Sequence, residues 1–258
     1  GDYVIALLNE WGVDTRYVGC DASALTPVVL AALAPPEEPQ IIFYRGQAAP
    51  DTTVTEDEVP VDDVRGCRVL WMSQGALALG ATAESSFAWL ELRGRSDDRD
   101  TVLDLDYRPT MWSSVHEARA AAQRAIAQSS VVVGNRTECE MAVGLDEPDA
   151  IVDDLLERGV RLAIVKLRGG GVLVADNSDR VRIDSLDIDV LCGLGAGDAF
   201  GGALVHGLLS GWDLERIGRF ANGAGAYVAT QLTCADAMPT TTMVDEVVEH
   251  GGTRGLQE

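Results

Sequence analysis

The sequence predicts an α/β protein: one three-layer α/β/α domain over residues 1–258, with a small β-lid whose strands lie within residues 13–45. Between residues 69 and 166, short apolar runs alternate with segments of helical periodicity. The strands expected there are continuous apolar runs, which is typical of a parallel sheet buried on both faces. Residues 15–44 contain predicted strands without helices, and this suits an antiparallel piece that projects from the sheet.

Hydrophobic periodicity and breaking residues place each element in chain order. Strands are expected at residues 28–33, 40–44, 69–72, 101–105, 131–133, 162–166 and 172–175. Helices are expected at residues 4–11, 82–92, 115–127, 150–158, 196–209, 214–230 and 243–249. Between the strand at residues 172–175 and the helix at residues 196–209, residues 181–191 are expected to be extended. Breaks are predicted at the proline-rich segment 35–39, the acidic stretch 55–63 and the charged segment 94–100.

Composition and charge exclude several classes of protein. Of the 258 residues, 47% are apolar and 24% are charged, as in a globular protein with a core. Twenty Lys and Arg residues oppose 41 Asp and Glu residues, and the resulting net charge of −21 disfavours nucleic acid as a partner. An anionic substrate would therefore need a local cationic pocket. No apolar run approaches the ~18 residues of a membrane span, and no signal peptide is recognised, so we expect a cytoplasmic protein with no membrane partner.

The cysteines and histidines form no recognisable site pattern. The five cysteines are Cys20, Cys67, Cys139, Cys192 and Cys234. They are scattered, odd in number and without a CxxC spacing, which is typical of reduced thiols in a cytosolic protein. The three histidines also lie far apart. The sequence therefore predicts neither a disulfide framework nor a zinc site.

The strongest local signal is the segment GLGAGDAFGG at residues 193–202. Its first three glycines lie at the start of a predicted helix, so backbone amides at the positive end of the helix dipole would form an anion site. Asp198 falls in the first turn, where a carboxylate suits phosphoryl transfer by accepting the proton of the acceptor hydroxyl. Alternatively, the glycines allow close helix packing and Asp198 caps the helix. The segment fits neither the Rossmann nor the Walker pattern.

The neighbouring sequence resembles a known family. The segment GLGAGDAFGGALVHGLLSGWDLERIGRFANGAGA resembles the C-terminal signature of the ribokinase-like (PfkB) carbohydrate kinases. Asn135-Arg136-Thr137-Glu138 is similar to the NxxE motif of that family, and IVKLRGGGV at residues 164–172 is similar to its nucleotide loop. This resemblance implies a ribokinase-like fold and an enzyme that phosphorylates a primary hydroxyl group, with ATP and Mg²⁺ as cofactors.

Other segments resemble the sugar-acid kinases of this family. FYRG at residues 43–46 with Ala48-Ala49, DLDYRPTMW at residues 104–112 and CADAMPT at residues 234–240 are the matching segments. They look like those of 2-keto-3-deoxygluconate kinase and, more closely, 5-dehydro-2-deoxygluconokinase. The resemblance implies a sugar acid as substrate, 5-dehydro-2-deoxygluconate of myo-inositol catabolism, and a homodimer through the lid. The alternatives are 2-keto-3-deoxygluconate, a neutral sugar, or a non-catalytic ligand-binding relative.

The resemblance also implies a role for each matched residue. The catalytic residues would be Asp198 as the base, with the amides of Gly195, Ala196 and Gly197 around the γ-phosphate. The nucleotide would be bound by Lys166, Gly169, Gly171 and Asn222, with Asn135 and Glu138 organising Mg²⁺ and the phosphates through water. The substrate would be bound by Tyr44, Asp106, Arg45 and Arg108, the two arginines holding the acid.

Ordinary structural roles compete with several of these assignments. Asn135 and Glu138 fit a helix N-cap and its N3 partner, which the residues alone favour. Arg108 fits a surface residue at a strand end, although two arginines at strand ends also fit a bidentate clamp for a carboxylate. Tyr44 fits lid or core packing.

Three features depart from the pattern of the family. Relatives begin with further strands, so we expect the domain to be incomplete at its N-terminus and its sugar site to lack one wall. Arg168 stands where the nucleotide loop usually has glycine, a residue that tolerates positive φ. Cys192 stands where relatives commonly carry Asp or Asn.

Overall fold

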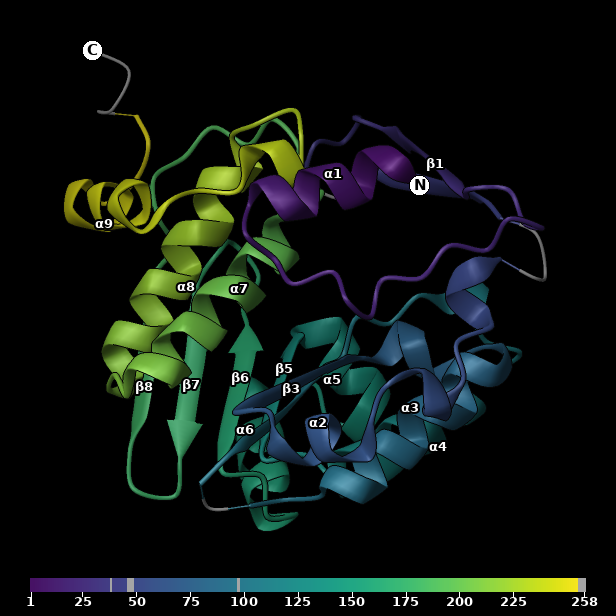
Figure 1. Cartoon of the computed structure of the whole chain (residues 1–258). Helices are drawn as coiled ribbons and strands as arrows, with labels where there is room; N and C mark the ends of the chain where they lie inside the picture. The colour runs from purple at the N-terminus through teal and green to yellow at the C-terminus, as the bar shows by residue number, and fades with distance from the viewer. Residues whose placement is uncertain (38, 46–48, 97, 255–258) are drawn as a thin grey trace.

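A computed structural model describes residues 1–37, 39–45, 49–96 and 98–254, and its centre is a mixed six-stranded sheet (Figure 1). The strands are β3 (Val69–Ser73), β4 (Asp100–Asp104), β5 (Val131–Asn135), β6 (Leu162–Lys166), β7 (Val172–Asp176) and β8 (Arg180–Ile183). They lie in sequence order across the sheet. The first four are parallel, and β7 and β8 continue the sheet antiparallel.

Helices cover both faces of this sheet. One face carries α3 (Gly80–Arg93), α4 (Val115–Ile126), α5 (Arg136–Val143) and α6 (Pro148–Glu157). The other face carries α7 (Ala196–Ser210) and α8 (Leu214–Ala229), and α9 (Thr241–His250) packs on α8. Strand side chains alternate between the two cores: Val131 and Val133 face α7 and α8, whereas Val132 faces the other layer. The predicted α/β/α architecture is confirmed.

Close backbone approaches fix the start of α7. A Cβ atom on Gly225 of α8 would lie 3.1 Å from the carbonyl oxygen of Ala196. A Cβ atom on Gly201 would lie 2.6 Å from the ring of Trp71 on β3. Because both positions lack a side chain, α7 can lie close to α8 and to β3, and its N-terminus is held over the sheet.

The lid is a two-stranded antiparallel sheet of β1 (Val28–Ala32) and β2 (Gln40–Tyr44), and both the lid and α1 (Asp2–Glu10) are drawn toward the top of Figure 1. Both strands match the predicted positions. The region of residues 13–27 expected to contribute to the lid contains no strand. No residue of α1 is buried. None of the described helices combines the length and the apolar content needed to cross a membrane.

Three elements were not predicted. The helix α2 (Val61–Gly66) lies partly in the acidic stretch predicted as a break; Asp62 and Asp63 occupy its first turn, where acidic residues favour a helix, and Val64 is buried. The short helix α5 begins at a capping box rather than at a clear apolar pattern. The strand β8 occupies part of the stretch expected to be merely extended, because its backbone pairs with β7.

Candidate active site

Two cavities meet at the N-terminus of α7. The first, of about 530 Å³, lies between the lid and the sheet and is here called the lid cavity. The second, of about 520 Å³, lies between α7, α8 and the loop after β6 and is called the loop cavity. Leu194, Gly195 and Asp198 line the lid cavity, while Gly193, Ala196 and Gly197 line the loop cavity. One short segment thus separates two sites of substrate size.

The parallel strands supply a row of polar residues to this region. Their last residues are Ser73, Asp104, Asn135 and Lys166. Ser73 lies opposite Asp104, and Asn135 lies opposite Lys166, in the register of neighbouring strands. Since carboxyl ends of parallel strands share one edge of a sheet, residues far apart in sequence converge where α/β proteins bind their ligands.

The turn before α7 is built around Gly195. This residue has φ of 86°, and a Cβ atom there would lie 2.6 Å from the Cβ of Cys234. The amide of Gly193 donates to the carbonyl of Pro36 at 2.8 Å, which ties the turn to the loop that connects β1 to β2. The amide of Ala196 donates to Gly193 at 3.3 Å. First-turn amides have no intrahelical acceptor, and the glycine N-cap has no side chain to accept from them. The amide of Gly197 is therefore open to an anion.

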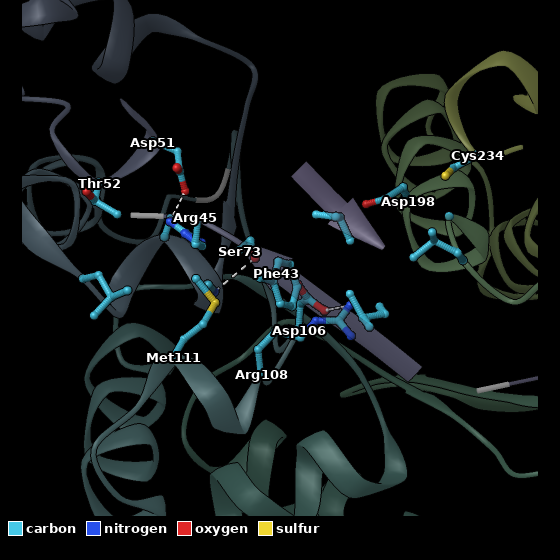
Figure 2. A pocket seen from close by; sticks show the side chains of 17 residues that line it. Phe43, Arg45, Asp51, Thr52, Ser73, Asp106, Arg108, Met111, Asp198 and Cys234 are labelled. Carbon is cyan, nitrogen blue, oxygen red and sulfur yellow. Dashed lines mark hydrogen bonds and ion pairs between the residues drawn. The ribbon is translucent and has the colours of Figure 1, made fainter. Parts of the chain in front are cut away.

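Asp198 stands at the junction of the two cavities, on the wall of the lid cavity (Figure 2). Partial burial raises the pKa of its carboxyl group, and the nearby carboxylate of Asp106 raises it further. Arg108 and Lys166 lower that pKa. Asp198 is thus a carboxylate of increased basicity beside an anion-binding helix end, which is the arrangement that proton abstraction from a hydroxyl group requires.

Two arginines enter the lid cavity from different segments, Arg45 after β2 and Arg108 after β4 (Figure 2). Arg45 pairs with Asp51 through Nη2. Arg108 pairs with Asp106, with 2.6 Å between Nη2 and Oδ1. The structure therefore brings together the predicted residues Arg45, Asp106 and Arg108, and both arginines already have a carboxylate partner.

Tyr44, which the resemblance assigns to substrate binding, does not line the lid cavity. Tyr44 is 61% exposed and is absent from the cavity wall, whereas Phe43 and Arg45 line it. Successive side chains of a strand point to opposite faces, so Tyr44 lies on the outer face of the lid. The sequence shows that successive side chains of β2 point to opposite faces, but it does not show which of the two faces lines the cavity.

Asn135 and Glu138 form the capping box that their sequence favours. The amide of Glu138 donates to Oδ1 of Asn135 at 2.9 Å, and the amide of Asn135 donates to Oε2 of Glu138 at 2.6 Å. Burial raises the pKa of Glu138, and Lys166 lowers it. Asn135 also lines the loop cavity, so the cap and a ligand role fall on the same residue.

The loop after β6 forms another wall of the loop cavity. Gly169 and Gly170 have φ of 81° and 92°, while no described residue other than glycine has positive φ. Arg168 is thus accommodated without backbone strain, and it is exposed. A Cβ atom on Gly171 would lie 2.8 Å from the carbonyl oxygen of Ile183. On the opposite wall, Asn222 donates to the carbonyl of Asp184 at 3.3 Å.

Asp104 is a buried acid that sequence reasoning did not assign to the site. It ends β4, is 9% exposed, and its Oδ1 has no hydrogen-bond partner among the described residues. Burial raises its pKa to about 7, Lys166 opposes that shift, and three further carboxyl groups add to it: Glu138, Asp106 and Asp198. The only sequence signal was its place in the segment DLDYR, two residues before Asp106.

A layered α/β fold with two cavities that meet at a glycine-rich helix N-terminus is typical of α/β proteins that bind a phosphate-bearing ligand. The sequence pattern described as "pfkB family carbohydrate kinase" matches residues 1–241. The chain belongs to this family and is a carbohydrate kinase.

Individual relatives agree with this assignment. The 5-dehydro-2-deoxygluconokinase of Shouchella clausii (strain KSM-K16) is 27% identical over 253 residues, covering 96% of this chain and 77% of that protein. The 5-dehydro-2-deoxygluconokinase of Geobacillus thermodenitrificans (strain NG80-2) is 25% identical over 256 residues, covering 97% and 75%. A crystal structure of fructokinase from Vibrio cholerae O395, with fructose, ADP and calcium ion bound, superimposes with a TM-score of 0.81 at 23% identity, covering 95% of this chain and 80% of that chain. The last similarity shows the shared fold.

Proposed function

We propose that this carbohydrate kinase transfers the γ-phosphate of ATP to a primary hydroxyl group of a sugar acid. The observation that carries the proposal is the meeting of two cavities at the N-terminus of α7, with Asp198 at the junction. The two arginines of the lid cavity favour an acidic substrate. Two relatives named 5-dehydro-2-deoxygluconokinase make 5-dehydro-2-deoxygluconate the first candidate, and 2-keto-3-deoxygluconate the alternative.

The sugar occupies the lid cavity in this proposal and the nucleotide occupies the loop cavity. Asp198 accepts the proton of the attacking hydroxyl group. The first-turn amides, that of Gly197 above all, hold the γ-phosphate at the positive end of α7. Gly169 and Gly171 line the phosphate side of the loop cavity, and Asn222 lies on the wall proposed for the adenine. Catalysis then depends on holding hydroxyl and phosphate in line.

The residues present fit a magnesium ion held through water. Among the described residues, no three His, Cys, Asp or Glu side chains form a ready metal cage. Mg²⁺ typically keeps several waters and takes one or two carboxylates plus substrate phosphates. Glu138 would provide the carboxylate, and Asn135, which lines the loop cavity, would provide a polar side chain beside the bound water. When bound with ATP, the ion would neutralise phosphate charge.

Arg45 and Arg108 are the proposed carboxylate clamp. A guanidinium group carries five N–H donors, and each arginine makes its ion pair in the described chain through Nη2. Asp51 and Asp106 would therefore orient the two arginines while leaving other donors for the substrate. The same pairs favour a second candidate, a neutral sugar, because they already offset both positive charges.

Replacing Arg108 with alanine distinguishes these two candidates. We expect Arg108→Ala to weaken binding of a sugar acid by about 1.5–3 kcal/mol, since a charge-assisted hydrogen bond is lost. Phosphorylation of a neutral analogue should change little. The measurement is kcat/KM for a panel of sugar acids and their neutral analogues. Arg158→Ala, at an exposed pair with Asp154 on α6, is the matched control. Equal losses for acid and neutral substrates would favour the neutral-sugar candidate.

The outer face of the lid is the proposed dimer contact. Val28 lies opposite Tyr44, and Leu30 lies opposite Ile42. These four side chains share one face and are each at least half exposed. A strongly apolar exposed face is typical of an interaction surface. We expect a dimer for the wild-type chain and a monomer for the Leu30→Glu, Ile42→Glu double variant in sedimentation. A wild-type monomer at high concentration would contradict the proposal.

A further inference from the structure

The side chain of Lys166 reaches the place where the two cavities meet. Lys166 is the only lysine in the 258 residues and the last residue of β6. Its Nζ lies 3.8 Å from the position that a Cβ atom would take on Gly197. Gly197 is in the first turn of α7. The ammonium group therefore lies beside the amides proposed to bind phosphate, rather than out along the glycine loop that follows β6.

Among the described residues, no carboxylate forms an ion pair with this ammonium group. Every ion pair among the described residues is made by an arginine, and none by Lys166. Its nearest described cation–π partner is the ring of Phe200, at 5.8 Å between Nζ and the ring centroid. A half-buried ammonium group that faces a cavity without a paired carboxylate is suited to an anionic ligand.

The surroundings of Lys166 are otherwise acidic. Burial raises the pKa values of Asp104, Glu138 and Asp198, and the positive charge of Lys166 lowers all three. Asp106 adds negative charge and Arg108 adds positive charge from the lid cavity. A transferring phosphoryl group would bring further negative charge into this region, and among the described residues that line the loop cavity Lys166 is the one basic side chain, beside the N-terminus of α7.

We propose that Lys166 is a catalytic residue whose ammonium group binds the phosphoryl group during its transfer; this rests on the proposed placement of ATP in the loop cavity. The bond between the γ-phosphorus and the β–γ bridging oxygen breaks, and its electron pair leaves with ADP. The acceptor oxygen forms a new bond to phosphorus, and its proton passes to the carboxylate of Asp198. Lys166 stays protonated throughout and stabilises the phosphoryl oxygens as a point charge.

The first test compares variants of two cations, one at the junction of the cavities and one outside both cavity walls. We expect Lys166→Gln to lower kcat by about 10²–10³-fold, the usual cost of one lost electrostatic contact to a transition state. The KM for the acceptor should stay within about threefold. Lys166→Arg keeps the charge and should recover part of the rate. Arg158→Gln removes the same charge at the end of α6, where the side chain lines neither cavity, and should change kcat by less than about threefold. Equal losses in the Lys166 and Arg158 variants would overturn the proposal.

The second test needs no turnover and no knowledge of the sugar. Reductive methylation with ¹³C-formaldehyde keeps the charge of an amine and labels the single lysine together with the N-terminal amine. The spectrum of Lys166→Arg assigns the two resonances. We expect the lysine signal to shift with β,γ-methylene-ATP, to shift less with ADP, and to stay unmoved with AMP. An equal shift with AMP, or no shift with β,γ-methylene-ATP, would overturn the proposal.

These results are independent of the acid clamp. If Arg108→Ala affects acid and neutral substrates equally, the choice of a sugar acid fails while the lysine signal still reports on the γ-phosphate. If Lys166→Gln does not fold, Lys166→Arg and the labelled wild-type chain still decide the question.

Discussion

Asp198→Asn is expected to lower kcat by about 10²–10⁴-fold, which is the range for a lost general base. Asparagine keeps the shape of the side chain and cannot accept the proton of the hydroxyl group. ATP affinity should change little, because Asp198 lines the lid cavity and not the loop cavity. The measurements are single-turnover rates and nucleotide binding by calorimetry.

The pH dependence of the wild-type rate gives a second readout of the same role. A base must be deprotonated, so the rate should fall as pH drops through the pKa of Asp198. That pKa is raised above 3.8 by burial and by Asp106, so the acidic limb should lie above the ordinary range of aspartate. Asp213→Asn, at the N-cap of α8, is the matched control. A variant at Asp198 that keeps more than about a tenth of the wild-type kcat would exclude the residue as base.

Asp104→Asn is expected to stabilise the fold at pH 8 by up to about 4 kcal/mol, measured without nucleotide or divalent cations. The folded state holds the pKa of Asp104 at about 7, against 3.8 for the ordinary group. Well below pH 3.8 the carboxyl group is protonated in both states and costs nothing, and near pH 4 the cost is still small. As pH rises toward 7, only the unfolded chain ionises, so the stability of the wild-type protein falls. Asparagine removes that cost because it does not ionise.

Denaturant unfolding of both proteins at pH 4 and pH 8 measures this difference. The comparison at pH 4 is the internal control, where the two free energies of unfolding should nearly agree. If Asp104→Asn is less stable than the wild-type protein at pH 8, or if the two free energies of unfolding differ equally at both pH values, the cost assigned to ionised, buried Asp104 is contradicted. Such a buried acid at the edge of the sheet is typical of sites where stability is given up for function.

The sequence predicted the layered fold because its local signals agree with the tertiary structure. Apolar runs mark strands that are buried on both faces, and β2 and β6 match their expected bounds exactly as residues 40–44 and 162–166. The glycines before α7 predicted a turn. At residue 195 that turn has φ of 86°, a conformation that favours glycine. Resemblance to the PfkB family added the ribokinase-like fold and the expected roles of the site residues.

Weak or ambiguous local signals account for the failures. The helix α2 is short and acidic, so its sequence pattern is that of a loop. The burial of Val64, which stabilises the helix, is visible only in the tertiary structure. The capping box of Asn135 and Glu138 is equally a structural cap and a candidate ligand pair, and the sequence does not separate the two. The resemblance assigned Tyr44 to the substrate, whereas strand alternation places Phe43 on the wall of the lid cavity and Tyr44 on the opposite face of the lid.

The sequence by itself determined the positions of most strands and helices, the acidic charge and the glycine-rich turn that carries Asp198, because each depends on neighbouring residues. Only the tertiary structure decided which side chains meet. The lid cavity joins Arg45 to Arg108, and one edge of the sheet aligns Asp104 with Lys166. Those residues are far apart in the chain. Their approach depends on strand register and on which face of each element points inward, and both are set by packing between segments that are distant in the sequence.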